Sequence, residues 1–414
     1  MPRSELRRKR FHPPTRWIKL AIELMRLPTS PFHEHNLLLW IWRFAQRRGL
    51  SARIDGVGNL IVSYEPAPSG SGQDSPPPLA FAAHLDHTGF WAVRMRDEKT
   101  LRAHWMGRFP EDLIVGGRVV FWTGGKPLAE AEPGLMPDAP DDFRVGGRRV
   151  GGVVTKVLGI NEEGDVTGVE VEVEEPVLPG SIGMWDLPDA DHRGGKFYAR
   201  ACDDVAGAAA LVCLLDVLVR EESPHPVTCV FTRAEEGGFF GAIHYCTEHY
   251  GPNATRKGPE LIVSVECSKA LPHAPQGLGP IVRVGDKHVM FEPEMTVWAS
   301  RCARALSLRE DTFLFQRKLM DGGTCESSVF QSWMGRAGAL CIALGNYHNQ
   351  NVEAGTIDLE NVDIGDWGNL VRLMQAMVEM RELSGGVLGE FKEWCVQWSD
   401  KHKHLYFEPA GVAE

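Results

Sequence analysis

The chain has 414 residues, of which 43% are hydrophobic and 24% are charged. This balance is typical of soluble globular proteins, excludes a disordered chain, and at this length favours two domains. The formal net charge of −11 argues against nucleic acid as a partner, because an acidic surface repels phosphate groups. The nine cysteines contain no C-x-x-C pair, which argues against a thiolate zinc site and favours a reducing cytoplasm over a disulfide framework.

The start of the chain is basic, with the sequence RSELRRKR at residues 3–10, and we interpret it as a solvated terminus, with a targeting or docking arm as the alternative. The apolar core of a secretory signal does not follow it. The sequence also contains no apolar run near the roughly 20 residues that a membrane-spanning helix requires. These features predict a cytoplasmic protein without a membrane partner.

In the first part of the chain, apolar side chains at helical spacing predict helices over about Thr15–Leu27 and Glu34–Arg48. Two short strands are expected in SARIDGVGNLIVSYE, followed by a surface loop in EPAPSGSGQDSPPP. From Phe90 to about Tyr198 the chain has short alternating runs such as GGRVVFWTGG and TGVEVEVEE, with no long helix. This pattern predicts an inserted β-rich domain.

From Asp203 onward, apolar strands and helical stretches alternate. The expected elements are a helix over 205–220, a strand over 226–232, a helix over 238–250, a strand over 261–266, a helix over 295–307, and strands near DTFLFQRK and GALCIALG. Such alternation predicts an α/β fold with a mixed, largely parallel sheet flanked by helices, in which sites form where strands end. We expect one domain from residues 1–89 and 199–414, and a second from 90–198.

Acidic and imidazole side chains follow several of the apolar strands. Glu235 and Glu236 stand where a strand gives way to glycines, and burying two like charges costs free energy unless cations or a shared proton compensate. A solvated loop pair is the alternative. His84 and Asp86 end the strand LAFAAHLD, and two residues apart on a strand they share one side. Glu266 ends the apolar strand LIVSVE, where a charge is unusual unless it is paired or metal-bound.

Two further segments add donors of the same kind. Asp203 and Asp204 precede a helix, so one of them is expected to cap it, which leaves the other able to bridge two cations. His348 lies in the loop GNYHNQ after an apolar strand, where a histidine without a ligand role is the alternative. His87 points away from the side shared by His84 and is not expected to be a ligand. The ordered set of histidines and carboxylates supplies enough donors for two divalent ions.

These segments resemble the di-metal aminopeptidases, a family that includes the glutamyl, leucyl and tetrahedral aminopeptidases within the wider zinc carboxypeptidase and aminoacylase clan. The segments that carry the resemblance are IDGVGNLIV, AHLDHTGF, GKFYARACDDVAG, TRAEEGGFFGA, GGTCES and the terminal histidine loop. The resemblance implies that His84, Asp203 and Glu266 hold one metal. It implies that Asp203, Glu236 and His348 hold the second.

In the same resemblance Glu235 is the general base and Asp86 supports His84. The implied cofactors are two divalent ions per subunit, with zinc the first choice and cobalt and manganese also compatible. A peptide substrate, a homo-oligomer (a dimer or a larger shell), and a dimerisation or substrate-gating role for the inserted domain are also implied. The chain departs from the family with HLDH in place of HMDE, with Glu266 in place of an aspartate, and with GTCE in place of GTDA.

Two other functions stay open at this point. One is a deacylase or carboxypeptidase of the same clan, which the GTCE segment and Glu266 favour slightly, and the other is a non-catalytic scaffold with the same fold. The preferred substrate residue is undetermined, although Arg233 or Lys269 could contact an acidic side chain. The roles of Cys325 and Glu326 are also open, with a thiol nucleophile disfavoured because no histidine segment pairs with Cys325.

Overall fold

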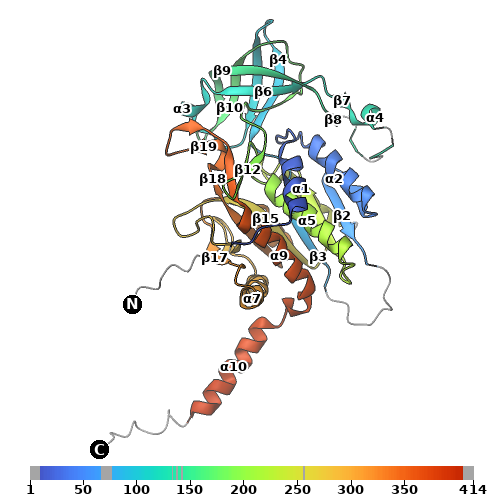
Figure 1. Cartoon of the computed structure of the whole chain (residues 1–414), viewed down its shortest axis with the longest axis vertical. Coiled ribbons are helices and arrows are strands. Elements are labelled where there is room, and N and C mark those ends of the chain that lie inside the picture. The colour runs from blue at the N-terminus through green and yellow to red at the C-terminus, as the bar shows by residue number, and fades with distance from the viewer. Residues whose placement is uncertain are drawn as a thin grey trace, which may run out of the picture.

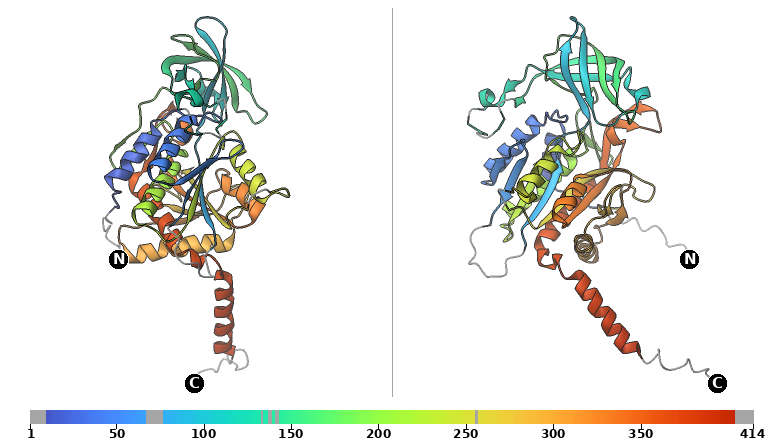
Figure 2. Two further views of the ribbon diagram at one scale, coloured as in Figure 1. Left: turned by 90° about the vertical axis from the view of Figure 1, so that its right-hand side faces the viewer. Right: turned by 180° about the vertical axis from the view of Figure 1, so that it is seen from behind.

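The computed structural model describes residues 10–66, 77–132, 134–136, 139–140, 143–254 and 257–403. It contains a helix-covered central sheet, a β-barrel, and a C-terminal helix, with the barrel and that helix at opposite ends of the molecule (Figures 1 and 2). The basic segment at residues 3–10 lies outside the described residues except for Arg10, which pairs with Asp363 at 3.1 Å. Most of the expected surface loop, residues 67–76, also lies outside them.

The central sheet has the strand order β1-β2-β14-β3-β15-β18-β21-β13-β12, with β16 pairing with both β17 and β18. Its strands are β1 Ser51–Ile54, β2 Leu60–Tyr64, β3 Leu79–His84, β12 Asp191–Arg193, β13 Lys196–Ala199, β14 Val227–Thr232, β15 Leu261–Lys269, β16 Ile281–Gly285, β17 Gln316–Leu319, β18 Ala337–Gly345 and β21 Glu360–Asp363. The four neighbours β14, β3, β15 and β18 are parallel, whereas β2 and β21 join them antiparallel. The sheet is therefore mixed, as expected, with its parallel part at the centre.

Helices cover both faces of this sheet (Figure 1). Their bounds are α1 Thr15–Met25, α2 His35–Arg47, α5 Val205–Arg220, α6 Phe240–Tyr250, α7 Pro293–Arg309, α8 Glu326–Met334 and α9 Ile364–Glu379, whereas α10 Val387–His402 projects away from the sheet. Because strand side chains alternate, Phe81 packs with α1, α5 and α9 on one face, whereas Ala80 and Ala82 pack with α6 and α8 on the other. Strands buried on both faces must be apolar throughout, which explains the continuous runs in the sequence.

The predicted helices α1, α2, α5, α6 and α7 each agree with the structure to within two residues at either end. The agreement follows from the helical spacing of their buried residues, which the sequence displays directly. None of the helices in the described part of the chain is both long enough and apolar enough to cross a membrane.

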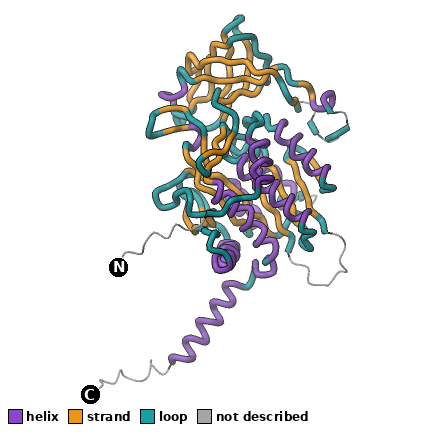
Figure 3. The backbone as a smooth tube through the Cα atoms, viewed as in Figure 1, coloured by secondary structure: helices purple, strands orange, loops and turns teal. Residues whose placement is uncertain are grey.

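A closed barrel occupies most of the interval that was expected to be β-rich (Figure 3). Its order is β10-β5-β4-β11-β6-β9, with bounds β4 Gly89–Met95, β5 Thr100–Met106, β6 Arg118–Thr123, β9 Arg148–Ile160, β10 Val166–Val173 and β11 Ile182–Trp185. Aromatic rings fill its core, where Phe90 packs edge-on against Trp105 and Trp185 at centroid distances of 4.6 and 5.0 Å. Closure leaves the barrel without free strand edges.

The short elements around the barrel are α3 Glu111–Ile114, α4 Leu128–Ala131, β7 Lys126–Pro127, β8 Arg144–Val145, β19 Gln350–Asn351 and β20 Thr356–Ile357. The end of the expected insertion does not belong to the barrel, because β12 and β13 pair with each other and β13 pairs with β21 of the central sheet. The barrel strands thus run from Gly89 to Trp185, a shorter span than residues 90–198.

Candidate metal centre

The side chains singled out in the sequence come together at the carboxyl ends of the parallel strands. His84 is the last residue of β3, the pair Glu235 and Glu236 follows β14, and Glu266 lies in the second half of β15. Parallel neighbours end at the same edge of a sheet, so these three segments meet there. Asp203 precedes α5, and His348 lies in the short 3-10 turn after β18. Five segments that are distant in sequence therefore contribute to one site.

Asp203 stands between the two histidines. Its Oδ1 lies 3.6 Å from Nε2 of His84, and its Oδ2 lies 3.8 Å from Nε2 of His348. His84 Nε2 is also 3.8 Å from Oε2 of Glu266, while His348 Nε2 is 2.9 Å from Oε1 of Glu236. One carboxylate with an oxygen toward each histidine has the arrangement that bridging two cations requires.

The possible ligand atoms form two groups. His84, Glu235 and Glu266 form one, Asp203, Glu236 and His348 form the other, and the ligand atoms within each group lie within 4.8 Å of one another. Asp203 Oδ1 and Glu266 Oε1 are buried and accept no hydrogen bond from the part of the chain that the structure describes. Buried polar atoms normally have partners. Buried carboxylate oxygens without a donor, in a site that also contains two imidazole rings, fit a pair of divalent ions, for which these donors are suitable ligands.

The electrostatics of the site point the same way. Burial raises the pKa of Glu266 to about 8. Burial also raises the pKa of Glu235 well above its usual value. Glu236 differs, because burial is outweighed by the adjacent His348 ring, which holds the pKa of Glu236 at about 2. Ionising several carboxyl groups that are buried away from water costs free energy, and bound cations would offset that cost.

Asp86 has a larger part in this geometry than support of His84. Its carboxylate is fully buried, and it accepts the backbone N–H of Glu235 at 2.9 Å through Oδ1 and that of Glu236 at 3.0 Å through Oδ2. Its Oδ1 lies 3.5 Å from Nδ1 of His84, whereas the backbone carbonyl of Asp86 is closer to that nitrogen, at 3.1 Å. Asp86 thus holds the backbone of the glutamate pair in place.

Glu360 of β21 is a supporting residue that the sequence analysis missed. Its Oε2 accepts the backbone N–H groups of Cys202 and Asp203 at 2.7 and 3.0 Å, and its Oε1 accepts that of His348 at 2.8 Å. Burial raises the pKa of this carboxyl to about 7. The sequence signal was only a charge in a short strand. Its importance follows from its hydrogen bonds to His348, which is 12 residues away in the chain, and to Asp203, which is 157 residues away.

Replacing Glu360 with Gln is expected to lower the free energy of unfolding by about 1–3 kcal/mol, because an amide NH₂ would face at least one backbone N–H that now has an acceptor. Denaturant unfolding of the metal-free protein measures this loss. Glu379→Gln, at the end of α9, is the control. Equal stability of the Glu360→Gln and control variants would contradict the supporting role.

Two local expectations have different outcomes. Asp204 occupies the position before α5, but its side chain makes no capping hydrogen bond, so the expected cap is wrong. Its carboxylate instead lies over Gly207, where an added Cβ would meet Asp204 Oδ1 at 2.2 Å. His87 belongs to neither ligand group, and its Nδ1 lies 2.8 Å from the carbonyl oxygen of Asp203 and its Nε2 3.1 Å from Oδ1 of Asn349. These contacts agree with a structural role for His87.

Arg233 is not available to a substrate. Its guanidinium donates to Oε2 of Glu34 and to the carbonyl oxygens of Val57 and Phe32, each at 2.6 Å. Lys269 is exposed at the end of β15. Arg233 therefore does not supply a contact to an acidic substrate side chain, because its guanidinium donates within the fold.

Cys325 and Glu326 are both buried beside the site. Cys325 is 2% exposed, and burial raises the pKa of its thiol, which disfavours a thiolate nucleophile. Glu326 accepts a hydrogen bond from Oγ1 of Thr232 at 2.7 Å, and burial raises the pKa of its carboxyl to about 7. Thr232 ends β14, so this contact links α8 to the strand that leads into the glutamate pair.

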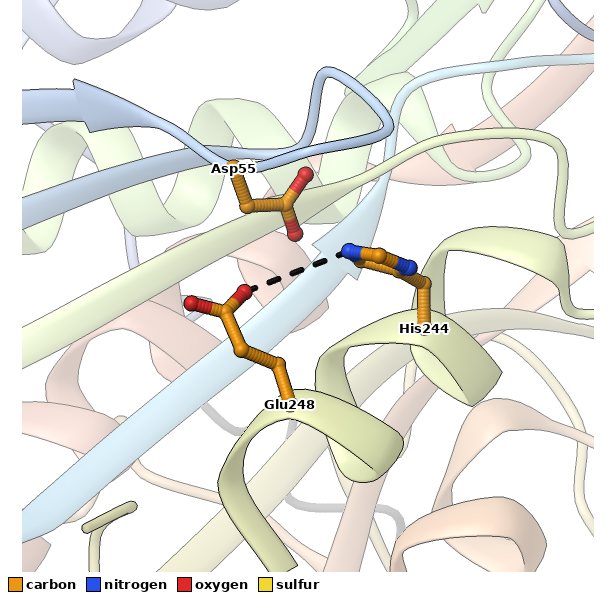
Figure 4. A group of neighbouring side chains, drawn as sticks. All are labelled: Asp55, His244 and Glu248. Carbon is orange, nitrogen blue, oxygen red and sulfur yellow. Dashed lines mark ion pairs between the residues drawn. The ribbon is translucent and has the colours of Figure 1, made fainter. Parts of the chain in front are cut away.

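A third group of possible ligands contains Asp55, His244 and Glu248 (Figure 4). His244 and Glu248 are one turn apart on α6, with His244 Nε2 4.0 Å from Glu248 Oε2. The Asp55 carboxylate is already used: it accepts the backbone N–H groups of Val57 and Asn59 and the Asn59 side-chain amide. We therefore interpret this group as structural.

The D-x-x-G-N segment that contains Asp55 braces the site from a distance. Asn59 donates its side-chain N–H to the carbonyl oxygen of Gly241 at 2.9 Å and accepts the backbone N–H of Arg233 at 3.0 Å. These bonds tie the turn between β1 and β2 to the segment that carries Glu235 and Glu236.

Comparisons with known proteins agree with this fold and site. The family model described as M42 glutamyl aminopeptidase matches residues 58–363. The chain is 23% identical over 227 residues to the glutamyl aminopeptidase of Lactococcus lactis subsp. cremoris (strain MG1363), a match that covers 54% of this chain and 58% of that enzyme. The chain therefore belongs to the M42 glutamyl aminopeptidase family, which is a family of peptide hydrolases.

Solved structures share the fold over nearly their whole length. Aminopeptidase APDkam598 from the archaeon Desulfurococcus kamchatkensis superposes with a TM-score of 0.68 at 19% identity, covering 90% of this chain and 98% of that one. The TET1 peptidase of Pyrococcus horikoshii gives 0.65 at 19% identity, with 87% and 99% coverage. These similarities establish the mixed sheet with its separate β-rich part.

Proposed function

We propose that this chain is a metal-dependent aminopeptidase that removes residues from the N-termini of peptides. The observation that carries the proposal is the position of Asp203, with one oxygen toward each of two groups that both contain a histidine and a glutamate. Membership of the M42 family supports it independently.

In this proposal His84, Asp203 and Glu266 hold one cation, and Asp203, Glu236 and His348 hold the other. We favour zinc, with cobalt and manganese also compatible with carboxylate and imidazole donors. When bound, such ions polarise the scissile carbonyl and make a water molecule more acidic.

Glu235 is the proposed general base. It is next to Glu236 in the chain, and its carboxylate lies within 4.8 Å of ligand atoms of His84 and Glu266. From this position it takes the proton of the attacking water and then delivers that proton to the leaving amine. Asp86 fixes the backbone of both glutamates, so that the base and the proposed ligand keep their relative positions.

We also propose that the domain formed by residues 1–89 and 199–414 holds the chemistry, and that the interval 90–198 serves dimerisation or substrate gating. The carbonyl oxygen of Arg108, in the loop after β5, is 3.4 Å from Nδ1 of His348, so the barrel borders the site.

We propose that the chain forms a homo-oligomer, either a dimer or a larger shell. The similar TET1 peptidase of Pyrococcus horikoshii assembles into a tetrahedron or an octahedral shell. A cytoplasmic location fits the free cysteines.

Aminoacyl anilides are expected to be hydrolysed, and N-acyl amino acids are not. The panel is tested on gently purified protein whose metal content has been measured, then after chelation and after return of zinc, cobalt or manganese. Chelation should abolish turnover and one of the ions should restore it, because the bound ions would supply the polarisation of the carbonyl and the more acidic water. The control is Glu162→Gln, a variant of an exposed residue, which measures the activity that is lost through purification and chelation alone.

Turnover of acylated compounds alone would reject the aminopeptidase assignment in favour of a deacylase or carboxypeptidase. Absence of bound divalent metal together with no turnover on either substrate class would favour the scaffold.

A further inference from the structure

Helix α10, Val387–His402, projects from the body of the molecule (Figures 1 and 2). Val387 is buried at its base, whereas the residues from Leu388 to Lys401 are exposed. The helix also lies beyond residue 363, where the family match ends. A 16-residue helix is marginal in water without a packing partner, so the exposure of this one points to a surface that another molecule covers.

The exposed surface of α10 carries a row of aromatic rings. Phe391, Trp394 and Trp398 are 61%, 52% and 52% exposed. The ring centroids of Phe391 and Trp394 are 5.6 Å apart, and those of Trp394 and Trp398 are 5.7 Å apart. Together with Val387, these residues follow the alternating spacing of four and three that forms the apolar seam of paired helices. A contiguous apolar row on a free helix marks an interaction site.

The distribution of charge along α10 favours antiparallel pairing with a second copy of the same helix. In its first half Glu390 and Glu393 outweigh Lys392, and in its second half Lys401 and Lys403 just beyond the end outweigh Asp400. An antiparallel pair of such helices sets the acidic half of each against the basic half of the other, whereas a parallel pair sets like against like. Glu390 and Lys401 are about three turns apart and share one flank of the ring row.

We propose that α10 pairs antiparallel with α10 of a second copy of this chain. The contact is isologous, because the same face and the same charges serve on both copies. An ion pair fixes the first turn of α10 against α7 in the orientation that the pairing needs. Nη2 of Arg301 in α7 lies 2.7 Å from Oε2 of Glu390. A groove between α7 and α10, lined by Val297, Arg301, Val387, Leu388, Phe391 and Trp394, continues the apolar seam at the base of the helix. The far end of the partner helix reaches this groove.

Sedimentation velocity of the full chain over a range of concentrations tests the pairing. The double variant Trp394→Glu/Trp398→Glu should raise the dissociation constant of the self-association at least about tenfold, since two central aromatic side chains are lost from the seam. Val396→Glu is the matched control, because Val396 is 54% exposed but lies on the opposite side of the helix. That variant should associate like the unmodified chain.

Lys401→Glu tests the orientation and should weaken association by placing an acid opposite Glu390 of the second copy. Turnover per subunit should be unchanged in all these variants, because α10 is remote from the metal site. Unaltered association of the double variant, or equal losses in the double variant and in Val396→Glu, would overturn the proposal. A monomeric unmodified chain that cosediments with phosphatidylcholine vesicles would assign the row to lipid instead. Unchanged association of Lys401→Glu would overturn the antiparallel orientation.

Discussion

Replacing Glu235 with Gln is expected to lower kcat by about 10²–10⁴ while leaving the metal content unchanged. The amide has nearly the same shape as the carboxyl group but cannot accept the proton of the attacking water. The backbone N–H of Glu235 still donates to Asp86, so the loop should keep its conformation. Steady-state kinetics on the best anilide, together with elemental analysis of the same preparation, measure both quantities.

The same variant also distinguishes a base from a ligand. Glu235 belongs to the group formed with His84 and Glu266, so a ligand role is a real competitor. Loss of metal from Glu235→Gln would assign the carboxylate to a cation, and an unchanged kcat would remove it from the reaction altogether.

Replacing Asp86 with Asn is expected to reduce metal affinity or activity by about 10–100-fold, a typical effect of losing a carboxylate that supports metal ligands. The two oxygens of Asp86 each accept one backbone N–H, from Glu235 and from Glu236. Asparagine has one oxygen, so its NH₂ group would face one of these donors and displace the glutamate pair. Metal titration followed by kinetics at saturating metal separates weaker binding from slower turnover.

Asp97 offers a matched control for Asp86. It also accepts two backbone N–H groups, from Lys99 and Thr100, but does so on the exposed turn between β4 and β5 of the barrel. Asp97→Asn should leave metal affinity and kcat unchanged. Equal behaviour of the two variants would show that Asp86 does not organise the site.

Much of the fold was readable from local patterns. The helices were predicted to within two residues because their buried side chains recur at helical spacing, and the buried strands because their apolar runs are continuous. The same patterns placed His84, Glu235 and Glu266 at strand ends. Parallel strands end at the same edge of a sheet, so these side chains were expected to meet there. Their convergence at that edge is therefore predictable from the sequence.

Other features depended on partners that no local pattern identifies. The strands β12 and β13 joined the central sheet because β13 pairs with β21, more than 160 residues further along the chain. One of Asp203 and Asp204 was expected to cap α5, yet Asp204 at the cap position makes no capping hydrogen bond and its carboxylate lies over Gly207. Arg233 was a plausible substrate contact until Glu34, Val57 and Phe32 were found to take its donors.

The sequence by itself determined which elements form and which side chains stand at their ends, because periodicity and residue type act over a few neighbouring residues. The tertiary structure alone decided which groups hold those side chains: Glu360 for Asp203 and His348, and Asp86 for the glutamate pair. It also decided that the row of rings on α10 stays exposed. Hydrogen bonds and packing join residues that are close in space, and their separation along the chain leaves no mark in the local sequence.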